Sequence, residues 1–258
     1  SITQLLPLSN TFPPAKRTNC FLIGETKRVL VDPSPGNIEE KQKLIYTIQG
    51  KNIDLIFLTH HHPDHHEFSV NIAREKSLPM GMSEDTHQRI LDKWGRDYFK
   101  GILIEIYSSG DILTQVRNKN VKLLATPGHD EGQLSIYPED LSWMIVSDLI
   151  QTIGTVVIQP PEGDMKKYFD SLTNVIEMKP FAVFPSHGIG MGGVDKLRVT
   201  LEHRKMRENQ ILSLLGEGKN KKEILSIVYA GLDKELIPYA EKTIQAHLKK
   251  INDEGLLC

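Results

Sequence analysis

The sequence lacks several features that would place the chain in a special class. Its two cysteines, Cys20 and Cys258, are too few for a disulfide framework, and we interpret them as free thiols in a reducing compartment. No apolar run approaches the ~18 residues of a membrane span. The first residues, SITQLLPLSN, lack the charged-then-apolar pattern of a signal peptide. We therefore expect a cytoplasmic protein that does not enter a membrane.

Composition and charge indicate a globular chain with two regions of different character. Its 258 residues can form one large domain, or a domain of about 200 residues with a small appendage. Up to Asp195 the chain has short apolar runs broken by Gly and Pro, and carries 19 Lys and Arg against 24 Asp and Glu. From Lys196 onward, long helical patterns carry 12 against 9. We therefore predict a boundary near Val194, with one domain over residues 1–194 and a helical one over residues 195–258.

Histidines are concentrated in one short stretch. The sequence THHHPDHHE, residues 59–67, contains five of the ten histidines of the chain. It follows IDLIFLT, residues 53–59, whose nearly continuous apolar character is typical of a strand buried on both faces. Because proline is excluded from a helix interior, Pro63 predicts a loop over residues 60–66, with a helix after it in EFSVNIAREK. Upstream, CFLIG and RVLVDPSPG predict a hairpin of two strands.

Three later segments repeat this arrangement of an apolar strand followed by His or Asp. They are VKLLATPGHDEG with His129, SWMIVSD ending at Asp148, and FAVFPSHGIG with His187. The strands of open α/β sheets hold the backbone rigid, while the loops at their ends present the chemistry. Together with the histidine stretch, these segments supply seven nitrogen and oxygen ligands: His60, His62, Asp64, His65, His129, Asp148 and His187. Seven such ligands suit two first-row metal ions that share one bridging carboxylate and leave positions open for water.

The motif His60-x-His62-x-Asp64-His65 resembles the H-x-H-x-D-H signature of the metallo-β-lactamase superfamily. PGH at 127–129, SD at 147–148 and PSHG at 185–188 resemble its later ligand motifs, and the resemblance spans about residues 1–195. It implies an α/β fold, a four-layered αββα sandwich. By the family pattern, one metal ion would be held by His60, His62 and His129, and the second by Asp64, His65 and His187, with Asp148 as the bridge. Zinc is expected, with manganese and iron as alternatives for a histidine-rich site.

Two positions depart from that pattern. The family commonly places small residues such as SGG after the D-H pair, where this chain has His66, Glu67 and Phe68, and position 61 is a third imidazole. We expect His61 and His66 to lie beside the ligands or to face solvent, and not to bind metal. Three further histidines stand in helical or polar contexts that are typical of ordinary hydrogen-bonded residues: His87, His203 and His247.

A pair of divalent ions predicts hydrolysis without a serine or cysteine nucleophile. Such ions lower the pKa of a shared water towards ~7 and polarise a carbonyl or phosphoryl oxygen. We interpret Asp64 and Asp148 as catalytic carboxylates that hold the ions and orient the bridging hydroxide. The flavodiiron branch of the fold typically has Glu where this chain has His62, and adds a flavodoxin-like domain, so a hydrolase is the better interpretation. A β-lactamase is disfavoured by the extra helical region and by the lack of an export signal.

The C-terminal region has its own resemblance. Residues 196–258 predict three helices with short connections, which form a small helical or winged-helix-like domain. Its LEHRKMREN stretch resembles the HR-x-x-R-E sequence that opens the same module in the β-lactamase-like-protein-2 branch of the superfamily. Relatives in that branch include a metal-dependent endoribonuclease that cleaves single-stranded RNA.

Two substrate classes follow from these resemblances. Hydrolysis of a small ester, thioester or lactone, as in the glyoxalase II and lactonase relatives, is favoured. RNA cleavage would require phosphates to lie along Arg204, Lys219, Lys221 and Lys222. Basic charge is sparse in this module, and Tyr229 and Tyr239 are its only aromatic residues for stacking bases. We therefore expect a lid over a small-molecule pocket, with RNA binding as the alternative. The sequence leaves the oligomeric state open.

Overall fold

Two six-stranded sheets form the centre of the molecule. The computed structural model describes residues 2–256. The first sheet has the order β1-β2-β3-β4-β5-β6 and the second the order β12-β11-β10-β9-β8-β7. The strands of the first are β1 (Ile2–Leu5), β2 (Cys20–Ile23), β3 (Val29–Val31), β4 (Leu55–Phe57), β5 (Met80–Met82) and β6 (Ile104–Ile106). Those of the second are β7 (Ile112–Val116), β8 (Lys119–Ala125), β9 (Leu134–Pro138), β10 (Met144–Gln151), β11 (Ala182–His187) and β12 (Met191–Gly192).

Both sheets are mixed. In the first, β3 pairs antiparallel with β2 and parallel with β4, and in the second, β10 pairs antiparallel with β9 and parallel with β11. The antiparallel pair of β2 and β3 confirms the hairpin that the sequence predicts. Because β4 and β11 each lie in a parallel pair, their carboxyl ends carry the functional loops at one edge of the two sheets.

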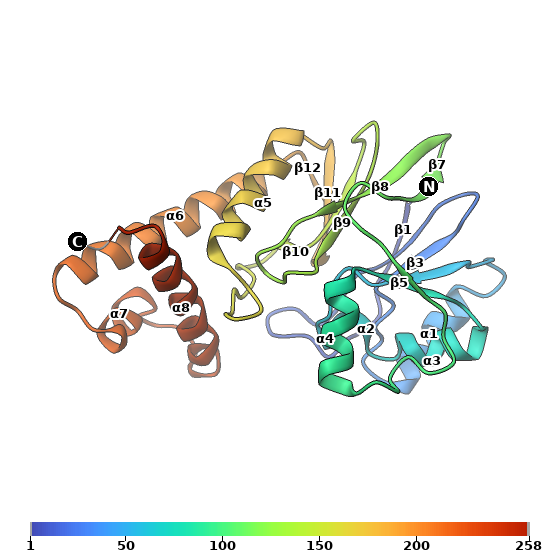
Figure 1. Cartoon of the computed structure of the whole chain (residues 1–258), viewed down its shortest axis with the longest axis horizontal. Helices are drawn as coiled ribbons and strands as arrows, with labels where there is room; N and C mark the ends of the chain where they lie inside the picture. Colours follow the sequence, from blue (N-terminus) through green and yellow to red (C-terminus); the bar gives the residue numbers. More distant parts are fainter. Residues whose placement is uncertain (1, 257–258) are drawn as a thin grey trace.

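Helices cover the outer face of each sheet (Figure 1). The first sheet is covered by α1 (Ile38–Thr47), α3 (Ser69–Lys76) and α4 (Glu84–Trp94), and the second by α5 (Met165–Met178) and the first half of α6 (Asp195–Gly216). A fourth helix on the side of the first sheet, α2 (Pro63–His66), is a single turn. The layers are therefore helix, sheet, sheet and helix, and the four-layered αββα sandwich is confirmed.

The sheets pack on each other through alternate side chains of their strands. Strands β2, β3 and β4 are buried on both faces, because side chains of one parity point between the sheets and the others point to the helices. The layer between the sheets includes Phe21, Val31, Phe57, Leu123, Ile136 and Ile145. The layer under the helices of the first sheet includes Leu22, Leu30, Ile56, Leu44, Ile72 and Ile90. Cys20 is a buried free thiol, whereas Cys258 lies outside the described residues.

Two local expectations were wrong. Residues 63–66 form α2 and not a loop, because Pro63 occupies the first turn, where the missing N–H of proline costs nothing. Strand β10 continues to Gln151 instead of ending at Asp148. Its pairing with β11 is irregular around Ser147, whose φ of 49° lies in the left-handed region. This irregularity explains how Asp148 belongs to the functional site from within a strand.

The C-terminal helices have a separate apolar core. It is formed by residues of α6, α7 (Lys221–Val228) and α8 (Ile237–Asp253), which a 3-10 turn, η1 (Lys234–Leu236), precedes. Figure 1 shows α6 running from the second sheet to α7 and α8. The first half of α6 packs on the sheet through Leu197 and Leu201, whereas Ile211 and Leu214 lie in the C-terminal core. The boundary near Val194 stays a prediction. Within residues 2–256, no helix combines the length and the apolar character that crossing a bilayer requires.

Candidate metal centre

The loops at one edge of the sandwich bring all seven predicted ligand residues together. The loop after β4 carries His60 and His62, and α2 carries Asp64 and His65. The turn between β8 and β9 carries His129, while Asp148 and His187 come from β10 and the end of β11. Each of the seven belongs to at least one group of imidazole or carboxylate atoms that all lie within 4.8 Å of one another. The assignment of these residues as ligands stays a prediction, which the geometry below supports.

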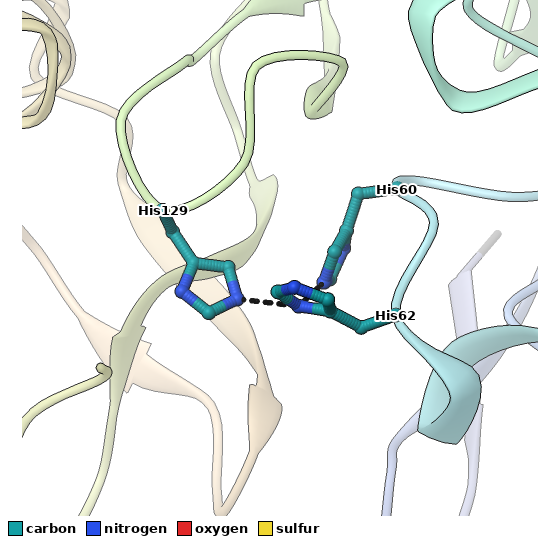
Figure 2. Close-up of side chains that lie close together, drawn as sticks. All are labelled: His60, His62 and His129. Carbon is teal, nitrogen blue, oxygen red and sulfur yellow. Dashed lines mark hydrogen bonds between the residues drawn. The ribbon is translucent and has the colours of Figure 1, made fainter. Parts of the chain in front are cut away.

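Three imidazoles form the first group (Figure 2). Nε2 of His60 lies 3.0 Å from Nδ1 of His62, and Nε2 of His129 lies 2.9 Å from the same nitrogen. Nitrogens bound to one zinc ion at about 2.0–2.1 Å are separated by roughly 3.3 Å in a tetrahedral site. These two separations are therefore close to those between ligands of one ion, and all three nitrogens lie within 4.8 Å of one another.

A second group adjoins the first across Asp148. Nε2 of His187 lies 3.4 Å from Oδ2 of Asp64, and Nε2 of His65 lies 4.0 Å from Oδ1 of Asp64. Oδ2 of Asp148 is 3.6 Å from Nε2 of His65 and 3.4 Å from Nε2 of His187. The same oxygen is also 3.4 Å from Nε2 of His129, which belongs to the first group. Asp148 thus stands where a carboxylate shared by two ions would stand.

Three of the imidazoles use the other ring nitrogen to bind an oxygen outside the groups. Nδ1 of His65 lies 2.9 Å from Oδ2 of the buried Asp32. Nδ1 of His129 lies 2.7 Å from the carbonyl oxygen of Val157, and Nδ1 of His187 lies 3.0 Å from that of Arg17. An oxygen there fixes the tautomer, so that the nitrogen facing the group keeps its lone pair for a metal.

The remaining two imidazoles have oxygens in comparable positions. Nδ1 of His60 is 3.2 Å from the hydroxyl of Thr59 and 3.4 Å from that of Ser147. Nε2 of His62 lies 3.5 Å from Oε2 of Glu162. All five histidines are therefore oriented by oxygens outside the site, which is the arrangement that supports metal-binding histidines in proteins.

The electrostatics of the site favour neutral imidazoles at His60 and His129. Burial, together with the neighbouring His65 and His62, holds the pKa of His60 well below its ordinary value. Burial and the adjacent His62 lower the pKa of His129 to about 4. Although burial opposes ionisation of Asp148, the imidazoles of His187 and His65 hold the pKa of its carboxyl well below the usual range. Burial opposes protonation of His65 and His187, but the Asp148 carboxylate raises the pKa of both imidazoles, so a divalent cation bound there would displace their protons.

Two further histidines of the cluster, His61 and His66, are buried, so of the two expected placements they lie beside the predicted ligands and do not face solvent. Nδ1 of His61 lies 2.5 Å from Oδ2 of Asp130, and both residues are buried. Nδ1 of His66 lies 2.8 Å from the hydroxyl of Tyr98. The pair of His61 and Asp130 joins the loop of His60 to the loop of His129. The other three histidines of the chain, His87, His203 and His247, belong to none of the ligand groups found within residues 2–256.

The oxygens behind the imidazoles were missed by the sequence reasoning. In the sequence, Asp32, Glu162 and Asp130 stand in no recognisable motif. One signal could have found Asp32, because it follows β3, which is the parallel neighbour of β4. The main-chain carbonyl groups of Arg17 and Val157 could not be identified from the sequence, because every residue type has such a group.

The C-terminal helices support this centre from behind. The segment between β10 and α5 contains Val157, whose carbonyl oxygen is the partner of His129. Arg204 of α6 donates a hydrogen bond to the carbonyl oxygen of Val156, the residue before Val157. From α8, Lys242 donates to Gln159 and Lys249 donates to Asp164. The segment is thus held between a predicted metal ligand and the C-terminal helices.

A glycine holds the other side of the His129 loop against α5. Gly128 has a φ of +130°, and a Cβ atom there would lie 2.3 Å from the main chain of Tyr168. The main-chain N–H of Asp164 also donates to the carbonyl oxygen of Gly128 over 2.8 Å. Only glycine permits this approach.

The comparisons with known proteins agree with this architecture. Residues 13–187 match the family described as the metallo-beta-lactamase superfamily, and residues 221–257 match the beta-lactamase associated winged helix domain. The chain is 25% identical over 273 residues to a protein of Drosophila melanogaster named beta-lactamase-like protein 2 homolog, with 100% of this chain and 89% of the relative covered. A homolog of the same name in Caenorhabditis elegans is 27% identical over 251 residues, covering 93% and 80%.

A third relative and a solved structure extend the comparison. An atrochrysone carboxyl ACP thioesterase of Claviceps purpurea is 25% identical over 210 residues, which cover 80% of this chain and 62% of that protein. The crystal structure of a beta-lactamase domain protein from Burkholderia ambifaria superimposes with a TM-score of 0.83 at 17% identity, covering 98% of this chain and 86% of the other. At that identity, the superposition shows the fold alone.

Proposed function

The chain belongs to the metallo-β-lactamase superfamily and is a metal-dependent hydrolase, and from this we propose that it uses two divalent ions to cleave a small ester, thioester or lactone. The observation that carries the proposal is the position of Asp148. One oxygen of this carboxylate lies 3.4 Å from an imidazole nitrogen of each ligand group, on His129 and on His187. A carboxylate in that position could serve as a ligand of two ions at once.

The residues divide into two sets around that carboxylate. His60, His62 and His129 would hold one ion, and Asp64, His65 and His187 the other. Five imidazole nitrogens and two carboxylates suit zinc, and manganese or iron are compatible with the same donors. When bound, two such ions supply hydroxide near neutral pH and withdraw electrons from the scissile carbonyl group.

The chain's own residues complete the chemistry. Asp64 and Asp148 supply the negative charge that retains the ions and orients the attacking water. The oxygens of Asp32, Val157 and Arg17 hold the imidazoles in one orientation, so that little reorganisation is needed during the reaction. Hydrolysis forms a bond between a water oxygen and the acyl carbon and breaks the bond from that carbon to oxygen or sulfur. One proton of the water passes to the leaving group, and the acid product releases the other to solvent.

Two observations support an acyl substrate over RNA. One relative is named as a thioesterase. In addition, the basic turn is partly neutralised, since Nζ of Lys221 lies 2.9 Å from Oε1 of Glu241 and Nζ of Lys219 lies 3.9 Å from Oε1 of Glu223. These pairs reduce the charge available to phosphates.

A turnover screen tests the proposal. The zinc-loaded chain would be assayed against a small ester, a thioester, a lactone, a β-lactam and a single-stranded oligoribonucleotide. We expect hydrolysis of at least one of the first three, with loss of activity in His62→Ala. Cleavage of the oligoribonucleotide that weakens steeply with salt, and disappears when Lys219, Lys221 and Lys222 are replaced by glutamate, would instead assign the module to RNA.

A further inference from the structure

A cavity of about 420 Å³ borders the metal centre at His187. Its wall includes Leu6, Ala15, Asn19, Ile153, His187 and Ile189. The volume falls within the range of about 300–1,000 Å³ that is usual for small-molecule pockets. His187 belongs both to this wall and to the second ligand group, so the cavity adjoins the predicted metal centre along this one residue.

The rim of the cavity is apolar and exposed. Leu6, Ile153 and Ile189 are 52%, 68% and 66% exposed, and they come from three separate loops, after β1, β10 and β11. Single exposed aliphatic side chains are normal. Three that converge on one cavity form an apolar surface, and covering it with an apolar group of a ligand is favourable. Lys16 and Arg17 lie in the same wall, and their positive charge disfavours a cationic occupant.

Hydrogen bonds tie the cavity wall to the loop of His187. The side-chain amide of Asn19 donates to the carbonyl oxygens of Pro185 and Gly188 over 2.7 and 2.8 Å. The main-chain N–H of Ile189 donates to the hydroxyl of Thr152 over 2.8 Å. Gly188 has a φ of +107°, and a Cβ atom there would lie 2.0 Å from that hydroxyl oxygen. The cavity is therefore formed before any ligand arrives, and its wall is rigidly connected to the metal centre.

We propose that this cavity is the acyl subsite, and that the substrates are esters or thioesters of acids with an uncharged apolar chain. The inference rests on the proposed function. The chain of the acid lies against Leu6, Ile153 and Ile189, and its carbonyl group lies at the mouth of the cavity beside His187. The leaving group lies outside the cavity.

The first test is the dependence of hydrolysis on acyl chain length. Straight-chain thioesters of one thiol, from acetyl to decanoyl, would be assayed with the zinc-loaded chain. Each methylene buried in the cavity should raise kcat/KM by about fourfold, the equivalent of about 0.8 kcal/mol, until the cavity is full. In Ile153→Asp and Ile189→Asp the ratio of octanoyl to acetyl turnover should fall at least tenfold, mainly through KM. The matched control is Ile227→Asp, since Ile227 is an exposed isoleucine of α7 away from the cavity, and its profile should equal that of the unaltered chain.

A binding measurement separates failure of the subsite from failure of the proposed function. Octanoate and butyrate would be titrated calorimetrically into the metal-stripped chain, and we expect octanoate to bind more tightly, with the difference lost in Ile153→Asp. If acetyl thioester is hydrolysed but the profile is flat and octanoate binds no better than butyrate, the subsite is overturned while the hydrolase stands. If octanoate binds as expected but no ester or thioester is turned over, the cavity binds an apolar chain, but the proposed function fails and the cavity is not an acyl subsite of a hydrolase.

Discussion

Nδ1 of His65 lies 2.9 Å from Oδ2 of Asp32, a buried carboxylate that stands behind the metal centre. Asp32 also accepts hydrogen bonds from the main-chain N–H of Thr59 over 2.8 Å and from its hydroxyl over 2.7 Å. Thr59 directly precedes the first histidine of the motif. One carboxylate therefore fixes both the orientation of the His65 imidazole and the position of the start of the ligand loop.

Asp32→Asn should weaken metal binding without removing a ligand. An amide in this position turns its NH₂ group towards either Thr59 or His65, where an acceptor is required. Loss of such an outer partner typically costs 10- to 100-fold in metal affinity. Competition of the variant with a chromophoric chelator for zinc would measure this. Asp54→Asn is the control, because Asp54 is an exposed carboxylate that accepts a hydrogen bond from the main chain of Arg28. Equal zinc affinities in Asp32→Asn and Asp54→Asn would show that Asp32 does not support metal binding.

Asp148→Ala should lose both ions, whereas His187→Ala should weaken mainly one. The reason is that Oδ2 of Asp148 faces imidazoles of both groups, whereas His187 belongs to the second group. Calorimetric titration with zinc would give the stoichiometry of each variant. Two tight ions in Asp148→Ala would show that this carboxylate is not the bridge.

Arg204→Met should impair the metal centre from a distance. Arg204 is buried and donates to the carbonyl oxygen of Val156, next to the carbonyl oxygen that orients His129. Removing this support frees the segment, and we expect about tenfold weaker binding of one of the two ions, at the lower end of outer-partner effects. Zinc affinity measured by chelator competition is the readout.

Arg207→Met is the matched control for that variant. Arg207 lies on the same helix, and its guanidinium donates to Gln210 and to the carbonyl oxygen of Val228, both within the C-terminal helices. Its loss should lower the melting temperature without changing zinc affinity. Equal losses of zinc affinity in Arg204→Met and Arg207→Met would mean that the C-terminal helices stabilise the fold but do not position the segment that orients His129.

Glu208→Gln should flatten the acid side of the stability profile. Burial raises the pKa of the Glu208 carboxyl, but hydrogen bonds from His247 and Lys250 outweigh it and hold the pKa below its ordinary value. A carboxyl whose pKa is depressed by folding contributes stability above its unfolded pKa of about 4.3, and this stability is lost as the pH falls through the folded pKa.

Urea unfolding between pH 7 and pH 3 tests this linkage. At pH 7 the free energy of unfolding of the variant should be about 2 kcal/mol lower than that of the unaltered chain, which is the usual contribution of a hydrogen bond to a charged group. Between pH 7 and pH 3 this free energy should fall less in the variant than in the unaltered chain. Glu202→Gln, an exposed carboxyl on the same helix, should follow the unaltered chain at every pH. Parallel acid profiles for Glu208→Gln and the unaltered chain would refute the role of Glu208.

The histidine motif and the strand-plus-ligand segments are visible in the sequence because they combine strong local signals. A buried strand has a characteristic apolar run, and imidazoles such as His60 and His129 are chemically distinctive. The sandwich followed from the family resemblance, and the residues that the motif names do meet in space. The expected ends of elements were less accurate, since Pro63 begins a helix that it could not continue, and β10 passes Asp148 with an irregular pairing at Ser147.

The outer support of the site could not be predicted in the same way. The partners of His187 and His129 are main-chain carbonyls of Arg17 and Val157, which depend on where loops pass and not on residue type. The burial of His61 depends on Asp130, which lies 69 positions along the chain in another loop. Such contacts are set by the packing of the two sheets, which no local pattern encodes.

We propose that hydrolysis depends on two ions held by these seven residues. The rate of ester or thioester hydrolysis, measured as zinc is added in fractions of an equivalent to the metal-stripped chain, tests this dependence. We predict no turnover without metal and a rate that stops rising at two equivalents per chain. Full activity of the metal-stripped chain, or a plateau at one equivalent, would contradict the assignment of two ions.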